Sequence, residues 1–187
     1  MPILKVARLG HPVLRQQAQA LTRKELASST VQQLIDNMID TMREYEGVGL
    51  AAPQVHESKS IFVMEVAENE RYPDAPAYGL KVFVNPQLSF PDPEQDLGWE
   101  GCLSIPNMRG LVPRYKKLHI KAWDRDGKDV ALTVEGFPAI VMQHEADHLA
   151  GVVYLDRMRD LTALAFDQEY ERYWVKDEET EAEPIES

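Results

Sequence analysis

The residues best suited to chemistry form the pattern H-E-x-x-H, which stands at His144, Glu145 and His148. Two histidines four residues apart project from the same side of a helix, because one turn takes about 3.6 residues. Both imidazoles can then bind one metal ion, and Glu145 can reach a water beside it without being a ligand. The pattern predicts metal-assisted hydrolysis with Glu145 as general base. The alternative is that both histidines are ordinary core residues.

The sequence around this motif favours a helix. Pro138 suits a first helical position, and Gly151 is typical of the residue just beyond a helix C-terminus. The helix would present one stripe to the core, made of Phe137, Val141, His144 and His148. The two possible ligands therefore continue the core-facing side.

A hydrolytic metal usually has three protein ligands and one open position, so a third ligand must lie elsewhere. The metzincin pattern would place a histidine where this chain has Tyr154, which excludes that pattern. A downstream glutamate, Glu169 or Glu171, is one candidate, although both stand in an acidic stretch. The other candidate is Cys102, the only cysteine of the chain.

Cys102 lies in a segment with glycine before it and Pro106 after it, which we expect to be bent and exposed. A lone cytosolic cysteine is more often an inert buried thiol. The missing third ligand nevertheless favours a thiolate bound to metal. One cysteine and two histidines would leave an open position, as catalytic sites do.

Composition places limits on the class of protein. The chain has 187 residues, of which 44% are hydrophobic, enough for the core of one domain. A net charge of −11 argues against a DNA-binding surface. The sequence contains neither an apolar run long enough for a bilayer nor the pattern of a signal peptide, so we expect a cytoplasmic protein and no membrane partner.

We expect one domain over residues 1–175, followed by a solvated, disordered tail over residues 176–187. The tail carries six acidic residues: Asp177, Glu178, Glu179, Glu181, Glu183 and Glu186.

Local patterns predict the other elements. Thr22 and Glu25 form a capping-box pattern, which predicts a long first helix reaching about Tyr45. Strands are expected over 61–64 and over 80–85, closed by Pro86, with a loop over 66–79 between them. A hairpin is expected over 118–123 and 130–134. A final helix is expected over 160–174, with Leu161, Leu164, Ala165 and Phe166 as inner residues. These elements predict an α+β single domain, with short, mainly antiparallel strands around a central metal-binding helix plus an N-terminal and a C-terminal helix.

The stretch Gly47–Gln54 is rich in glycine and alanine, so backbone can approach another group closely. It lacks the pattern of a phosphate-binding loop. By itself the stretch could equally be a turn before a strand.

Three segments together resemble the signature motifs of the peptide deformylase family. They are Gly47–Gln54, with the order G-x-G-x-A-A-x-Q, the E-G-C-L-S segment at 100–104, and the Q-H-E-x-D-H segment at 143–148. The resemblance extends from Gly10 to about Met158, with the motifs in family order and at similar spacing.

The resemblance implies removal of the formyl group from the N-terminal methionine of nascent chains. It implies that Cys102, His144 and His148 bind one divalent metal, with the hydrolytic water as fourth ligand and Glu145 as the acid and base. The family's ion is usually Fe(II), with Zn, Ni or Co able to occupy the site. The Gln54 side chain and the Leu103 backbone N–H match the family's oxyanion donors.

The resemblance also implies a peptide-binding site. The Gly49 backbone would pair with the extended substrate, and Arg109 would contact the peptide beyond methionine. Glu46 and Arg114 match a family ion pair. The methionine pocket would be lined by Val48, Phe137 and Val141.

The partners implied are N-formyl-methionyl nascent peptides, and hence proximity to the ribosome, in a bacterial cytoplasm. Many members end in a basic helix that docks on the ribosome. This chain is acidic from Asp167 onward, which argues against docking through its tail. Two other functions stay open: another H-E-x-x-H metallopeptidase, and a non-enzymatic domain with a structural metal.

Overall fold

The computed structural model describes residues 2–66 and 77–175. Most of the loop expected over 66–79, and all of the acidic tail expected over 176–187, lie outside the described residues. Among the helices of the described ranges, none has the length and apolarity to span a membrane.

A five-stranded antiparallel sheet forms the larger part of the structure, in the order β1-β2-β3-β6-β7. Its strands are β1 (Gly49–Ala51), β2 (Ile61–Val66), β3 (Tyr78–Ser89), β6 (Lys117–Trp123) and β7 (Asp129–Glu135). The pair β6 and β7 is the hairpin that the sequence predicts. A smaller antiparallel sheet, in the order β4-β5-β8, contains β4 (Gln95–Cys102), β5 (Ile105–Tyr115) and β8 (Leu164–Phe166).

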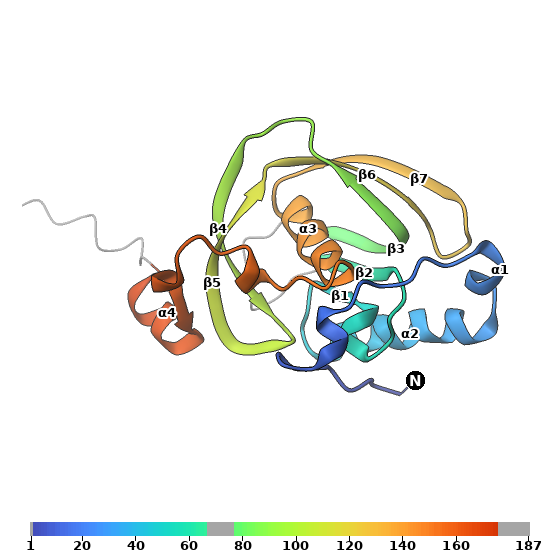
Figure 1. The fold of residues 1–187 in the computed structure, drawn as a ribbon, viewed down its shortest axis with the longest axis horizontal. Coiled ribbons are helices and arrows are strands. Elements are labelled where there is room, and N and C mark those ends of the chain that lie inside the picture. Colours follow the sequence, from blue (N-terminus) through green and yellow to red (C-terminus); the bar gives the residue numbers. More distant parts are fainter. Residues whose placement is uncertain (1, 67–76, 176–187) are drawn as a thin grey trace, which may run out of the picture.

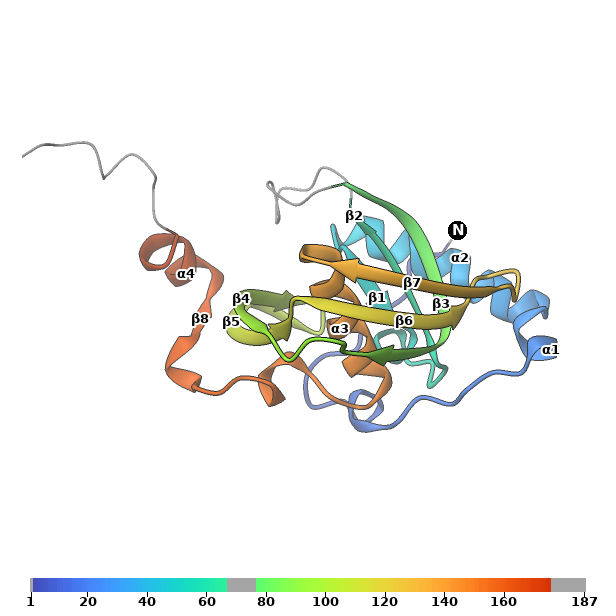
Figure 2. The same cartoon turned by 90° about the horizontal axis from the view of Figure 1, so that it is seen from above.

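The larger sheet is covered by a helix on each side at β1 and β2. Helix α2 (Ser29–Glu44) lies on one side and helix α3 (Phe137–Leu149) on the other (Figures 1 and 2). Successive side chains of β2 alternate between them: Phe62 and Met64 join the core around α3, while Ile61 and Val63 join the core around α2. A strand buried on both faces needs apolar side chains on both, which explains the unbroken apolar run Ile61–Met64 in β2.

Helix α3 occupies the centre of the molecule, surrounded by strands (Figure 1). Gly136 precedes it and Pro138 stands in its first turn, while Gly151 follows its end with a φ of 74°. The expected helix boundaries and the α+β class are therefore confirmed. Most of the helix is buried, including all of its polar residues, which are Gln143, His144, Glu145, Asp147 and His148. A helix buried nearly all round must satisfy those polar groups inside the protein.

The prediction of one long first helix is wrong in one respect, because the segment forms two helices. The capping box of Thr22 and Glu25 begins α1 (Arg23–Leu26), but Ser28 is extended and caps α2 afresh. Its hydroxyl donates to the Glu25 carbonyl at 2.6 Å, and so ends one helix as it starts the next.

Strand β3 also differs from its prediction, since it continues beyond Pro86 to Ser89. The pairing with β6 is shifted between Val84 and Gln87, and Asn85 has a φ of 50°. Proline has no N–H for a ladder, so it is tolerated at this bulge.

The final helix expected over 160–174 is present but shorter than predicted. Within this range only α4 (Asp167–Tyr173) is α-helical, and the preceding strand β8 pairs with β5. Asp160 caps a short turn by accepting from the Thr162 N–H at 2.8 Å. Of the expected inner residues, Leu161 and Phe166 are 66% and 62% exposed, while Leu164 and Ala165 are partly buried. Sheet pairing therefore outweighs helical periodicity here.

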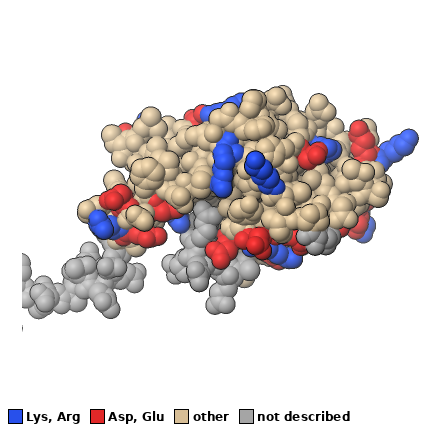
Figure 3. Space-filling view, turned by 90° about the horizontal axis from the view of Figure 1, so that it is seen from below, with Lys and Arg blue, Asp and Glu red and all other residues tan. Residues whose placement is uncertain are grey.

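Figure 3 shows charged side chains of both signs interspersed on one face of the molecule.

Candidate metal centre

Strand β4 and helix α3 bring the candidate ligands together. Glu100 and Cys102 are two residues apart at the end of β4, and both side chains are buried. The segment around Cys102 is bent, as expected, but the expected exposure is wrong: Cys102 is the buried last residue of β4, directly before the turn into β5. The hairpin register, in which Cys102 lies opposite Ile105, turns the sulfur toward α3.

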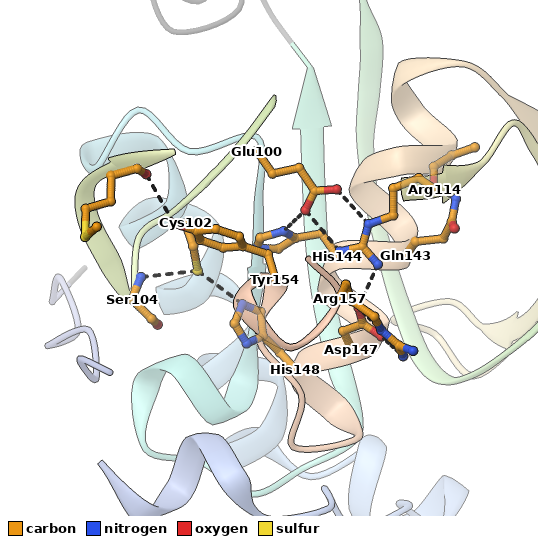
Figure 4. A network of polar contacts seen from close by, with 12 residues as sticks. Glu100, Cys102, Ser104, Arg114, Gln143, His144, Asp147, His148, Tyr154 and Arg157 are labelled. Carbon is orange, nitrogen blue, oxygen red and sulfur yellow. Dashed lines mark hydrogen bonds and ion pairs between the residues drawn. The ribbon is translucent and has the colours of Figure 1, made fainter. Parts of the chain in front are cut away.

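Cys102, His144 and His148 form a cluster whose ligand atoms all lie within 4.8 Å of one another. The sulfur lies 3.3 Å from Nε2 of His148, and the two imidazole rings meet edge to face at 5.0 Å (Figure 4). Neither Glu169 nor Glu171 belongs to this cluster. The geometry therefore selects Cys102 from the candidate third ligands.

Each imidazole keeps one nitrogen for the cluster. Nδ1 of His144 lies 2.8 Å from Oε2 of Glu100, which leaves Nε2 of His144 for a cation. Burial alone would raise the pKa of Glu100, but the hydrogen bonds from His144 and Arg114 outweigh it and lower this pKa to about 2. Glu100 is therefore an ionised partner that orients His144.

Arg114 binds two buried carboxylates behind the cluster. Its Nε and Nη2 donate to Glu100 at 2.6 and 3.0 Å, and its Nη1 donates to Asp147 at 2.6 Å. Arg157 also donates to Asp147, at 2.6 and 3.1 Å. The expected ion pair of Arg114 with Glu46 is thus wrong, because the guanidinium lies between Glu100 and Asp147 (Figure 4).

Glu145 is buried beside the cluster, and its Oε2 has no hydrogen-bond partner among the described residues. Burial raises the pKa of Glu145 to about 7, although the imidazoles of His144 and His148 act in the opposite direction. The carboxylate lies against Gly49, where a β-carbon would come within 2.8 Å of its Cγ and Cδ. A carboxylate with a pKa near neutrality suits proton transfer.

The side chain of Gln54 is held with its amide group toward the cluster. Its Oε1 accepts the Ala51 N–H at 2.8 Å, so Nε2 faces Ser104 Oγ at 3.3 Å and Cys102 Sγ at 3.6 Å. The amide is thereby oriented as a donor.

A cleft opens onto the cluster, and most of the predicted site residues line it: Val48, Gly49, Gln54, Cys102, Leu103, Phe137, Val141, His144 and Glu145. His148 lies below it, 1% exposed. Arg109 lines an adjoining cleft that shares Cys102 and Leu103. Its Nε donates to Asp167 at 3.2 Å, and its guanidinium lies 5.0 Å from the Tyr170 ring centroid.

The donor set fits a divalent cation. Burial opposes ionisation of Cys102, but His148 and His144 outweigh burial and hold the pKa of the thiol well below its usual value. A thiolate and two imidazoles suit zinc or iron, and three protein ligands leave one position open.

The family model described as polypeptide deformylase matches residues 3–163 of this chain. The chain belongs to the peptide deformylase family. A peptide deformylase of Leptospira biflexa is 38% identical over 170 residues, which cover 90% of this chain and 95% of the relative. Peptide deformylase 1 of Bordetella pertussis is 40% identical over 161 residues, 86% of this chain and 90% of the relative.

Solved peptide deformylases share the fold. The class I type b enzyme of Acinetobacter baumannii with Met-Ala-Ser bound has a TM-score of 0.81 and 41% identity, covering 84% of this chain and 99% of that one. The peptide deformylase of Thermotoga maritima has a TM-score of 0.76 and 36% identity, covering 86% and 100%. The expected family and enzyme class are confirmed, and the Cys-His-His cluster is what a metal-dependent deformylase requires.

Sequence reasoning did not identify the partners of the candidate ligands. The sequence presents Glu100 only as part of a motif, although strand alternation places it on the same face as Cys102. Asp147 follows His144 by three residues on one helix, which is a further signal. The donation from the Ser104 N–H to the Cys102 sulfur, at 3.4 Å, had no signal in the sequence.

Proposed function

We propose that this protein hydrolyses the formyl group from the N-terminal methionine of newly synthesised polypeptides. Membership of the peptide deformylase family supports this reaction. The observation that carries the proposal is the convergence of Cys102, His144 and His148 directly beneath a cleft that Glu145 also lines. Residues 1–175 would form the catalytic domain and residues 176–187 an acidic tail.

Cys102, His144 and His148 would hold one divalent ion, and we propose Fe(II), which Zn, Ni or Co could replace in purified protein. When bound, the ion would supply Lewis acidity, which acidifies a water and polarises the formyl carbonyl. Glu100 would keep His144 in the tautomer that binds through Nε2, as its 2.8 Å contact with Nδ1 supports.

Glu145 would accept the proton of the attacking water and later pass it to the departing amine. Its burial and its pKa near 7 support both roles, because the carboxylate can hold and release a proton near neutrality. Gln54 Nε2 and the Leu103 N–H would donate hydrogen bonds to the charge that develops on the formyl oxygen. Such donors typically contribute on the order of 3 kcal/mol to the transition state.

The substrate would enter as an extended chain. β1 is an edge strand of its sheet, so the backbone at Gly49 is suited to pairing with a peptide. The apolar wall of the cleft, formed by Val48, Phe137 and Val141, would accept the methionine side chain. Arg109, in the adjoining cleft, would contact the residues that follow. The nascent peptide would be met in the cytoplasm, near the ribosome.

The direct test compares two peptides on protein purified without oxygen and analysed for metal. Formyl-Met-Ala and an unformylated peptide of similar length are offered side by side, and formate and new amino groups are measured. We expect formate from the first and no cleavage of the second. Hydrolysis of internal bonds in the unformylated peptide alone would instead indicate another metallopeptidase.

A further inference from the structure

The N-terminal segment Ala7–Leu9 is hydrogen-bonded to two separate segments of the candidate site. The Ala7 N–H donates to the carbonyl of Gln54 at 2.7 Å, and the Leu9 N–H donates to the carbonyl of Ser104 at 2.9 Å. Two loops distant in sequence, which carry the proposed oxyanion donors Gln54 and Leu103, are thereby joined through one extended segment.

The side chain between these two contacts reaches the same loop. Arg8 Nη1 donates to the carbonyl of Leu103 at 2.8 Å. That carbonyl belongs to the same peptide group as the N–H of Ser104, and this N–H lies 3.4 Å from the Cys102 sulfur (Figure 4). A guanidinium, one peptide group and a sulfur therefore form a continuous chain of donors and acceptors.

Such a chain transmits charge by polarisation. A cation bound to a carbonyl draws electron density from its peptide group, which makes the N–H at the other end a better donor. A stronger donor withdraws electron density from a thiolate ligand, and groups that bond to ligands tune the metal they hold.

We propose that Arg8 is a positioning residue that acts through the Leu103–Ser104 peptide group on the Cys102 sulfur. In this role Arg8 limits electron donation from the thiolate and so keeps the bound cation a stronger Lewis acid. The inference rests on the proposed metal-binding role of Cys102.

The experiment uses the full chain loaded with cobalt, because thiolate-to-cobalt charge transfer reports the sulfur directly. Arg8→Met removes the donor, and Arg8→Lys keeps a cation. Arg23→Met is the matched control, because Arg23 is a half-exposed arginine whose partners, Asp129 and the Trp123 ring, do not line the candidate cleft. Arg8 is exposed, so we expect all variants to fold with equal melting temperatures.

In Arg8→Met the charge-transfer band should move to longer wavelength, because a more electron-rich sulfur is easier to oxidise. Arg8→Lys should restore most of the original position, and Arg23→Met should leave it unchanged. With formyl-Met-Ala, kcat of Arg8→Met should fall about tenfold, the low end for groups behind a ligand.

A band in Arg8→Met that matches the band of Arg23→Met would overturn the inference, even if kcat fell. A shifted band in a protein whose unaltered form releases no formate would instead support the inference and overturn the proposed function.

Discussion

The carboxylate of Glu145 lies directly against the backbone of Gly49, so closely that a β-carbon at Gly49 would come within 2.8 Å of its Cγ and Cδ. Real β-carbons essentially never approach other heavy atoms so closely. The glycine of the G-x-G-x-A-A-x-Q segment therefore has a role beyond exposing backbone to a peptide. It leaves the space that the proposed general base occupies.

Gly49→Ala should displace Glu145 and lower kcat about 10- to 100-fold, since a shift of about 1 Å can cost that much. Metal content should be unchanged, because the three atoms nearest to a β-carbon at Gly49 all belong to Glu145, which is not among the three ligands of the cluster. Steady-state kinetics and metal analysis measure both quantities. Gly98→Ala is the matched control, because a β-carbon there meets no heavy atom within 4 Å. Equal losses in both variants would contradict the steric explanation.

Glu145→Gln should lower turnover of formyl-Met-Ala by at least about 100-fold, the lower range for loss of an acid and base. Gln is nearly the same size and cannot take a proton, so the cluster should still bind metal. Full activity in this variant would show that another group is the base.

The same variant should change the pH dependence of stability. The pKa of Glu145 is raised from 4.5 to about 7, so the folded protein binds this proton more tightly than the unfolded chain does. In the wild type, the contribution of this bound proton to the free energy of unfolding is therefore fully present below about pH 4.5 and is lost as the pH rises to about 7. In metal-free protein, Glu145→Gln should gain stability relative to wild type over this window, on the order of 3 kcal/mol at most. Urea unfolding at several pH values measures it, and a constant difference would contradict the raised pKa.

Arg114→Met should destabilise the protein by about 3–5 kcal/mol, because it leaves Glu100 and Asp147 as buried carboxylates without this partner. His144 should also lose its fixed orientation, so metal affinity should fall. Lys117→Met is the control, since the Lys117–Glu135 pair is 41% and 65% exposed and should contribute under about 1 kcal/mol. Equal losses in the free energy of unfolding for the two variants, measured with urea, would contradict a structural role for Arg114.

Cys102→Ser should weaken metal binding at least about tenfold, because a hydroxyl is a poorer ligand than a thiolate. Competition with a chromophoric chelator measures the affinity. Metal binding equal to that of the unaltered protein would exclude Cys102 from the ligand set.

Several features follow from the sequence because they depend on neighbours along the chain. The spacing of His144 and His148 places both on one helix face, and Pro138 and Gly151 bound that helix. Thr22 and Glu25 cap each other across three residues. The apolar run of β2 reflects burial on both faces.

Other features depend on contacts between distant segments, so only the tertiary structure decided them. The final segment pairs as β8 with β5 instead of continuing as a helix, and Arg114 binds Glu100 and Asp147 instead of Glu46. Helical and ionic patterns in a sequence are compatible with more than one structure. The distant segment or residue that pairs with them determines which structure forms.

The chemical types of the site were thus determined by the sequence alone: one thiol, two imidazoles and a carboxylate able to move a proton. Their convergence was decided by the tertiary structure, because the β4–β5 register turns Cys102 toward α3. Within those elements, His148 and His144 outweigh burial and lower the pKa of the Cys102 thiol, while burial raises the pKa of Glu145. A residue type supplies a functional group, but its environment in the fold sets its protonation and its neighbours.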